Sequence, residues 1–208
     1  MNGLMIARRL LQLYAGLMLY GFSVALMVRA DLGLNPWNVF HQGVALRTGL
    51  SFGTAVILVG AVVLLLWWPL RQKPGIGTVS NIFVIGLTAN ASLQLLASPH
   101  GYAARFLVLG LGILLNGIAG GAYIGAGLGP GPRDGLMTGL SARTGRPLGP
   151  VRTGLEIGVL AIGWLLGGTA GIGTLCYALA IGWLVELFLP WFTIRPRPAA
   201  APDPELAL

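Results

Sequence analysis

The chain has 208 residues, of which 55% are hydrophobic and only 9% carry a charge, and its mean hydropathy is +0.80. This composition excludes an ordinary soluble domain, in which about a quarter of the residues are charged, and several apolar runs are long enough to cross the roughly 30 Å core of a bilayer. The net charge of +7 therefore reports membrane topology rather than nucleic-acid binding, and the single cysteine, Cys176, allows no disulfide framework.

Six membrane spans and two shorter helices are predicted along the chain. The spans are expected at about residues 8–28, 50–70, 76–97, 104–124, 147–167 and 172–193. The shorter helices are expected at 36–48 and 132–144, and the Ala- and Pro-rich tail 195–208 is expected to be disordered. The predicted fold class is an all-α polytopic membrane protein.

The chain repeats itself after 96 positions without a gap. Residues 9–94 align with residues 105–190, and 26 of these 86 pairs are identical, clustered at glycines, a proline and polar residues. A tandem duplication predicts two membrane repeats, 1–98 and 99–194, each with three spans and one short helix. Because the number of spans per repeat is odd, the second repeat would be inverted in the membrane, as in many secondary transporters.

The two short helices have start and stop signals. Pro36 and Pro132 suit a first helical turn, Asn35 is a good N-cap and Gly131 a weaker one, and the glycine that follows each helix can adopt the left-handed C′ conformation. Helices of this length extend about 20 Å, and their polar side chains would be costly against lipid. We therefore expect re-entrant half-helices, preceded by non-helical backbone that lines a cavity.

The distribution of Lys and Arg favours a cytoplasmic N-terminus. With six spans, ten of the 13 basic residues lie inside and three outside. An alternative with eight complete spans and a parallel repeat divides them nine to four, so charge alone leaves both arrangements open. The shortness and polarity of residues 36–48 and 132–144 favour six spans, with both termini cytoplasmic.

The starts of the half-helices form the candidate solute site. Its residues are Asn35, Pro36, Trp37, Asn38, Arg133 and Asp134. A helix N-terminus carries roughly half a positive charge. Two such ends near the midplane, with Arg133 beside one of them, favour an anionic or carboxylate-bearing solute.

A second set of ionisable residues lies within the predicted spans. Arg152, Glu156 and Glu186 align with the uncharged Val56, Gly60 and Asn90 of the first repeat. A charge at the centre of a span costs on the order of 2.5–3.5 kcal/mol and is a functional hypothesis by default. These residues are expected to couple transport to a proton or, in the competing interpretation, to form structural ion pairs.

Other conspicuous residues favour structural roles. Arg47 and Arg143 lie in the last turns of the half-helices, where they are expected to cap and to compensate the helix dipole. His41 is expected to be a hydrogen-bonded packing residue. Three tryptophans at span ends are interpreted as interfacial anchors: Trp67, Trp68 and Trp191.

The residues around the first half-helix resemble a known family. The pattern Leu32-Gly33-Leu34-Asn35-Pro36-Trp37, followed by Gly43, Arg47-Thr48-Gly49 and Phe52-Gly53, is similar to that of the YczE/YitT-type bacterial integral membrane proteins. The resemblance covers nearly the whole chain except the tail and implies an inner-membrane protein with several spans. It carries no substrate, catalytic residue or cofactor. The second repeat has Arg133 where the first has Trp37, so the tryptophan is confined to one half.

The expected function is a transporter or channel in the bacterial inner membrane, with its solute site at the midplane. The alternative is a non-transporting accessory or regulatory scaffold, and glycine-rich helix faces could also hold a second copy of the chain. An enzyme is not expected, because no Cys/His cluster has metal-ligand spacing and no nucleophilic triad can be assembled. The expected partners are the lipid bilayer and a small-molecule solute. No cofactor, metal or nucleic-acid partner is expected.

Overall fold

The computed structural model describes residues 3–194, and these residues form eight α-helices and no strand. The helices are α1 (Gly3–Ala30), α2 (Pro36–Thr48), α3 (Phe52–Trp67), α4 (Ile76–Leu95), α5 (Tyr102–Gly125), α6 (Pro132–Thr144), α7 (Leu148–Leu165) and α8 (Ile172–Phe192). The all-α prediction is confirmed, and the tail predicted to be disordered lies outside the described residues.

Six helices correspond to the predicted spans. Five of them, α1, α4, α5, α7 and α8, are long and apolar enough to cross a membrane. The sixth, α3, has 16 residues, and it qualifies only together with α2, from which it is bent by 111°. It begins after the N-cap Ser51, whose hydroxyl accepts the Thr54 N–H at 3.3 Å, and it ends just before Pro69, which cannot continue a helix.

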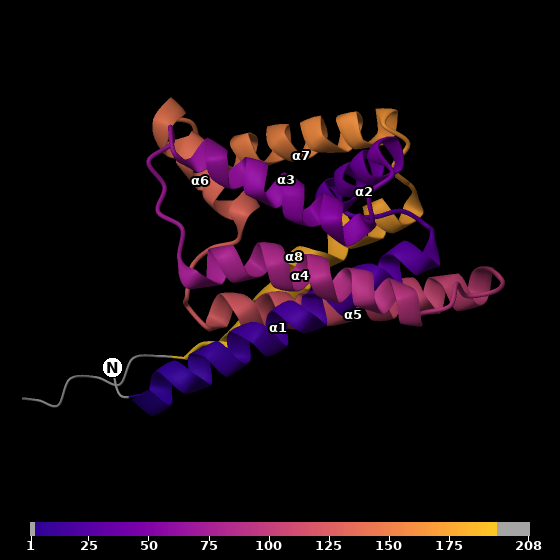
Figure 1. Ribbon diagram of the computed structural model, residues 1–208, viewed down its shortest axis with the longest axis horizontal. Coiled ribbons are helices and arrows are strands. Elements are labelled where there is room, and N and C mark those ends of the chain that lie inside the picture. Colours follow the sequence, from indigo (N-terminus) through magenta and orange to yellow (C-terminus); the bar gives the residue numbers. More distant parts are fainter. Residues whose placement is uncertain (1–2, 195–208) are drawn as a thin grey trace, which may run out of the picture.

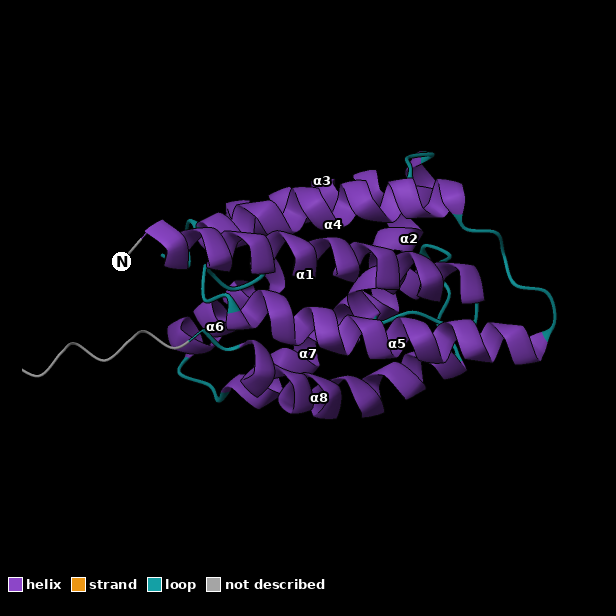
Figure 2. Cartoon of the chain, turned by 90° about the horizontal axis from the view of Figure 1, so that it is seen from below, coloured by secondary structure: helices purple, strands orange, loops and turns teal. Residues whose placement is uncertain are grey.

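The helices form two layers (Figure 1). One layer contains α1, α4, α5 and α8, and the other contains α2, α3, α6 and α7. Figure 2 shows α1 and α5 side by side, with α4 along α1 and α8 along α5. Helices α1 and α5 cross closely, and glycines make room for the crossing. A Cβ at Gly16 would lie only 2.9 Å from the Tyr123 amide nitrogen, and a Cβ at Gly112 only 2.8 Å from Cγ of Met27. Small residues permit such approach between helices in lipid.

The two halves of the chain make equivalent contacts. The pairs α1–α4 and α2–α7 correspond to α5–α8 and α6–α3 after a shift of 96 positions, and all four pairs pack. The Gly173 N–H donates to the Leu32 carbonyl at 2.7 Å, and the equivalent Gly77 N–H donates to the Leu128 carbonyl at 2.8 Å. The irregular stretch before each of the short helices α2 and α6, which are named half-helices below only for their length, is therefore held by the last helix of the other half.

The half-helices begin and end as their sequences predict. The Asn35 side chain accepts the Asn38 N–H at 2.9 Å, whereas Gly131 caps α6 without a side-chain bond. Gly49 and Gly145 both adopt the left-handed conformation, with φ of 72° and 67°. These caps fix the length of both helices.

Arg47 and Arg143 lie in the last turns of α2 and α6, as predicted, and both also donate to carbonyl groups of neighbouring segments. The Arg47 Nε donates to the Leu166 carbonyl at 3.1 Å, at the C-terminal end of α7. Arg143 donates to the Pro69 carbonyl, just beyond α3. Each guanidinium is therefore near the negative end of its own helix and also bonds a carbonyl at or beyond the end of a neighbouring one.

The predicted role of Trp67 as an interfacial anchor is wrong. Its side chain is 2% exposed, and its Nε1 donates to the Pro132 carbonyl at 2.9 Å. The ring fills the space left by Gly135, where a Cβ would lie 2.0 Å from the ring. Because Gly135 of α6 has no side chain, the Trp67 ring of α3 can pack against it and hold the start of α6. Trp68 and Trp191 are exposed.

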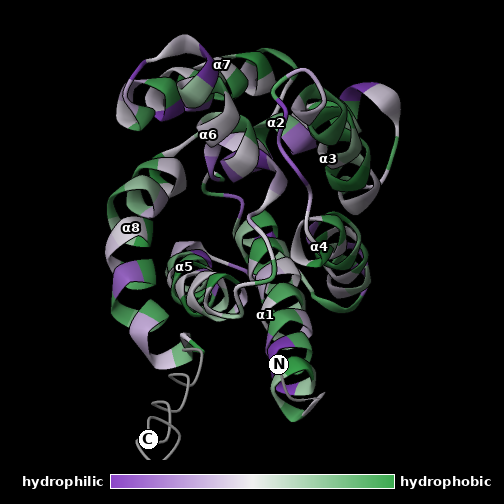
Figure 3. Cartoon of the chain, turned by 90° about the vertical axis from the view of Figure 1, so that its left-hand side faces the viewer, coloured by the Kyte–Doolittle hydropathy of each residue, from purple (hydrophilic) through white to green (hydrophobic). Residues whose placement is uncertain are grey.

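One contact breaks the correspondence between the halves. Helix α3 packs along α4, but the equivalent helices α7 and α8 do not pack on each other in the same way. Figure 3, which looks along the long helices, shows α7 standing apart from α8. Only Val151 and Gly163 of α7 are buried. The two seams, α3–α4 and α7–α8, therefore differ although their sequences descend from one repeat.

Candidate functional site

A cavity of about 330 Å³ reaches the half-helix starts from the open side between α7 and α8. We refer to it as the α7–α8 cavity. Its lining comprises Tyr20, Asn35, Pro36, Trp37, Asn116, Gly120, Tyr123, Ile124, Arg133, Asp134, Arg152, Glu156, Tyr177, Ala178, Ile181, Gly182, Val185 and Glu186. The structure thus brings together eight of the nine residues predicted for the solute site and for coupling.

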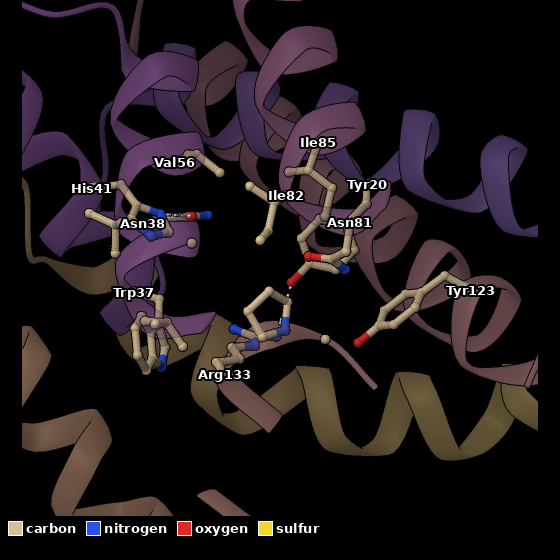
Figure 4. Close-up of a pocket in the computed structure, with 15 residues that line it drawn as sticks. Tyr20, Trp37, Asn38, His41, Val56, Asn81, Ile82, Ile85, Tyr123 and Arg133 are labelled. Atoms are coloured by element: carbon tan, nitrogen blue, oxygen red, sulfur yellow. Dashed lines mark hydrogen bonds between the residues drawn. The ribbon is translucent and has the colours of Figure 1, made fainter. Parts of the chain in front are cut away.

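The ninth predicted residue, Asn38, lines a smaller cavity on the other side of the half-helix starts. This α3–α4 cavity has a volume of about 70 Å³, and Figure 4 shows Asn38, His41 and Trp37 on one side of it and Arg133 on another. The remaining walls come mainly from apolar side chains of α3 and α4. Trp37 and Arg133 line both cavities, so they separate the two spaces.

The start of α2 presents hydrogen-bond donors that meet no acceptor within residues 3–194. Asn35 Nδ2, Trp37 Nε1 and Asn38 Nδ2 are buried and lack a hydrogen-bond partner among the described residues. The Asn35 and Asn38 side chains use their oxygens instead, toward the Asn38 N–H and the His41 ring. An unpaired buried donor costs about 1–3 kcal/mol, so three of them at one helix start point to a ligand that accepts hydrogen bonds.

Arg133 adds a cation beside these donors. Its guanidinium donates to the Tyr20 hydroxyl at 3.0 Å, and its Nε lies 3.9 Å from a carboxylate oxygen of Asp134. A guanidinium has five N–H donors, so Arg133 can still bind a solute. Tyr20 holds it at the boundary between the cavities.

The two half-helix starts are not electrostatically equivalent. In α6 the first turn contains Asp134, whose carboxylate accepts from the Tyr123 hydroxyl at 3.2 Å. The equivalent residue in α2 is the neutral Asn38, and α2 has no acidic residue in its first turn. The positive end of α2 therefore remains free for an anion, whereas that of α6 is already compensated.

The residues predicted for coupling divide into a pair and a single carboxylate. The Arg152 Nε donates to the Glu156 carboxylate at 3.1 Å on the exposed side of α7. Glu186 faces the same cavity from α8, and it has no ion-pair partner among the described residues. Among the acidic groups of the site, Glu186 is thus the one without a partner of opposite charge in the described part of the chain.

Sequence reasoning missed the polar residues that α1, α5 and α8 contribute. Tyr20, Tyr123 and Tyr177 line the α7–α8 cavity together with Asn116. The Tyr177 hydroxyl donates to Asn116 Oδ1 at 2.9 Å, and Asn116 Nδ2 donates to the Ser23 hydroxyl at 2.8 Å. Isolated tyrosines within apolar runs resemble packing residues. A usable signal was the repeat, because Tyr20 aligns with Asn116 and both positions are polar.

Within residues 3–194, no group of three His, Cys, Asp or Glu side chains is placed to hold a metal ion. The polar chemistry of the site consists of amide, indole, hydroxyl and guanidinium donors with three carboxylates. Groups of this kind are able to hydrogen-bond a small polar molecule or to exchange a proton.

Comparisons with known proteins place the chain in a family. The profile of a family of unknown function, DUF6198, matches residues 7–190. An uncharacterized protein of Haemophilus influenzae is 40% identical over 173 residues, which cover 83% of this chain and 79% of that protein. The uncharacterized membrane protein YczE of Bacillus subtilis is 34% identical over 179 residues, covering 85% of this chain and 83% of YczE.

A third relative is more distant. The uncharacterized protein YyaS of Bacillus subtilis is 22% identical over 179 residues, with 84% of this chain and 89% of YyaS covered. No solved structure matches the chain. Because the family profile and YczE both cover most of the chain, and because its helices are apolar and long, the chain is a membrane protein that belongs to the YczE-type family, described as a family of unknown function.

Proposed function

We propose that this protein is an inner-membrane transporter or channel for a small anionic solute, with a carboxylate as the simplest case. The observation that carries the proposal is a set of three buried donors at the start of α2, next to Arg133, that have no acceptor among residues 3–194. A carboxylate supplies several acceptor sites and a negative charge. In the α7–α8 cavity it would accept hydrogen bonds from Asn35 and Trp37, which line that cavity, beside the positive end of α2.

The size of the cavity supports a small solute. Ligand pockets usually have volumes of about 300–1,000 Å³, and the α7–α8 cavity, at about 330 Å³, lies at the lower end of this range. Polar groups converge at the half-helix starts, while Ile181, Val185 and Ala178 line the wall contributed by α8. This arrangement suits a solute with an anionic head and only a short apolar part.

The proposed arrangement in the membrane is an inverted repeat with six spans. The equivalent cross-contacts of Leu32 with Gly173 and of Leu128 with Gly77 support a two-fold relation between the halves. The bend of 111° between α2 and α3 supports a half-helix that returns toward the side from which it entered. With six spans and most Lys and Arg on the inside, both termini are cytoplasmic.

Glu186 is the proposed coupling residue, and Glu156 the secondary candidate. The ionisable groups facing the α7–α8 cavity are Arg133 and Asp134 from α6, Arg152 and Glu156 from α7, Glu186 from α8, and the hydroxyls of Tyr20, Tyr123 and Tyr177. Two cations against three carboxylates leave one negative charge. Glu186 is the one of these carboxylates that has no ion-pair partner among the described residues, so it is the proposed proton carrier.

The proposal is tested with the full-length protein in proteoliposomes. Uptake of radiolabelled acetate, lactate and succinate, and of nitrate and phosphate, is compared with uptake of glycerol and of methylammonium. We expect at least one small carboxylate to be taken up faster than by empty liposomes and faster than by the Asn38→Asp variant, which repels anions at α2. Transport of methylammonium alone, unchanged by Asn38→Asp, would overturn the anion assignment.

The second candidate is the scaffold. It is favoured by one observation: α7 has open space around Gly154 and Gly158, so another helix could approach it closely. If the protein is a scaffold, the purified protein should transport none of the solutes tested. It should copurify with a partner protein, and Gly158→Leu should abolish this copurification. A transporter predicts uptake by the protein alone.

A further inference from the structure

The two cavities are related by the internal repeat. Of the 15 residues that line the α3–α4 cavity, 11 have their equivalent, 96 positions away, in the lining of the α7–α8 cavity. The equivalent pairs are 20/116, 37/133, 38/134, 56/152, 60/156, 81/177, 82/178, 85/181, 131/35, 132/36 and 133/37. The two spaces are therefore the same site in the two halves, collapsed to about 70 Å³ in one and open at about 330 Å³ in the other.

We infer that these cavities are alternate access routes to the solute site, and that the two seams exchange conformations during transport. In the state described here α7–α8 is open and α3–α4 is closed. In the other state α7–α8 would close and α3–α4 would open to the opposite side of the membrane. The inference deepens the proposed transport function and rests on it.

The closed seam is built on two glycines. In α3–α4, a Cβ at Gly53 would lie 1.9 Å from the Gly86 carbonyl oxygen, and a Cβ at Gly86 would lie 2.6 Å from that of Gly53. The backbones are in contact there. The repeat keeps the same glycines as Gly149 and Gly182, yet a Cβ at either position would meet nothing within 4 Å. Glycine at both positions has no packing role in the open state, but it would permit the same backbone contact if α7 and α8 closed.

The side chains across the seams are also complementary in size. In α3–α4, Ile82 packs onto Gly60, with its Cγ1 2.9 Å from where a Cβ of Gly60 would lie. At the equivalent places, α7 has the larger Glu156 and α8 the smaller Ala178. In both seams a large residue on one helix is therefore opposite a small residue on the other, so this pair of positions is compatible with closure of α7–α8.

Closure would also give Glu186 a hydrogen-bond donor. Asn90 Oδ1 accepts the Gly53 N–H at 2.7 Å, in the first turn of α3. Glu186 and Gly149 are the equivalents of Asn90 and Gly53. A closed α7–α8 seam would therefore bring the Glu186 carboxyl group to the first turn of α7, where the helix N-terminus favours a negative charge.

Thiol accessibility in membrane vesicles tests the exchange without knowledge of the solute. The exposed Cys176 is first replaced by serine, and Ile82→Cys and Ala178→Cys are then made separately at equivalent positions. Phe83→Cys and Leu179→Cys, whose native side chains are exposed on the outer surface, are matched controls. A membrane-impermeant, negatively charged thiol reagent is added from either side of the membrane, and labelling rates are measured.

Substitutions of single glycines are then used to favour the open or the closed form of each seam. Gly86→Leu does not fit the closed α3–α4 seam, whereas Gly182→Leu fits the open α7–α8 seam and obstructs its closure. Gly110→Leu, also at an exposed glycine with open space, is the control for Gly182→Leu. We expect Gly86→Leu to raise labelling at position 82 and lower it at position 178, each at least tenfold, from opposite sides of the membrane. We expect Gly182→Leu to do the reverse and to abolish uptake in proteoliposomes, while Gly110→Leu changes neither.

The outcomes separate the inference from the proposed function. If Gly182→Leu leaves labelling at position 82 equal to that of Gly110→Leu, or if position 178 is labelled only in detergent, the exchange of seams is refuted even when carboxylate uptake is observed. If both labelling patterns exchange as expected but no anion is transported, the access routes stand and the anionic solute is wrong. A Cβ at Gly182 would meet no atom within 4 Å, so Gly182→Leu is expected to fold. The comparison of Gly182→Leu with Gly110→Leu therefore stands even if Gly86→Leu fails to fold.

Discussion

Replacing Arg133 by glutamine tests the solute site directly. The change removes the positive charge at the boundary between the two cavities but keeps a long polar side chain. In the structure the guanidinium donates to Tyr20 at 3.0 Å and lies 3.9 Å from Asp134. Its remaining donors have no hydrogen-bond partner among residues 3–194, and we assign them to the anionic solute.

The expected loss of affinity follows from the type of hydrogen bond. A bond to a charged group contributes about 1.5–3 kcal/mol, compared with about 0.5–1.5 kcal/mol for a neutral one. Arg133→Gln should therefore weaken binding of the transported carboxylate roughly ten- to a hundredfold. The Arg133 side chain is 32% exposed, which places the loss toward the lower value. Trp37→Phe, which removes a neutral donor, should cost only about fivefold.

Binding is measured by titration calorimetry, and by inhibition of uptake, with the best carboxylate from the proteoliposome screen. Arg146→Gln is the matched control, because it makes the same change in net charge at an exposed position outside both cavities. Thermal unfolding in detergent verifies that Arg133→Gln keeps the fold. Because only one hydrogen bond of the guanidinium to the described residues is lost, we expect a stability cost of about 1 kcal/mol.

Two results would refute the reasoning. If Arg133→Gln and Arg146→Gln reduced affinity equally, bulk charge rather than the site would determine anion binding. If Arg133→Gln left the affinity for the carboxylate unchanged while the protein stayed folded, the half-helix starts would not be the anion site. A solute of neutral or positive charge would then have to be sought.

The remaining predictions concern topology, the start of α2 and coupling. Reporters fused at Arg71 and at the C-terminus should both indicate the cytoplasm, and one at His100 the outside; a cytoplasmic signal at His100 contradicts six spans. Asn38→Asp, which copies Asp134 of the second repeat, should lower anion affinity at least tenfold, as calorimetry would record. Glu186→Gln should flatten the pH dependence of uptake in proteoliposomes, whereas Glu156→Gln, which removes half of an exposed ion pair, should change it less; unchanged profiles in both variants would make these residues structural.

The positions of the helices could be predicted from the sequence because their signals are local. Hydrophobic length locates a span, and proline, asparagine and glycine at fixed offsets locate the ends of α2 and α6. The φ values of 72° at Gly49 and 67° at Gly145 follow from the need for glycine at the C′ position. The length of α3 was less predictable, because Trp67 and Trp68 continue the apolar run while Pro69 ends the helix.

The roles of individual side chains were predictable only where they depend on neighbours in the chain. The Arg152–Glu156 pair is four residues apart on one helix, so the sequence suffices for it. Trp67 was misassigned because its partners, Pro132 and Gly135, lie in another helix. Arg47 and Arg143 stand in the predicted last turns, but their acceptors belong to α7 and to the residues after α3.

The sequence by itself determined the membrane class, the repeat, the helix positions and the residue types at the half-helix starts, because composition, periodicity and capping act over a few residues. Only the tertiary structure decided that the donors of Asn35, Trp37 and Asn38 meet no acceptor in the described part of the chain, and that one seam is closed while its equivalent is open. The glycine pairs Gly53–Gly86 and Gly149–Gly182 are identical in the two repeats, so no local signal distinguishes them. Which pair is in contact depends on the packing of whole helices, and this packing can have two solutions for one sequence pattern.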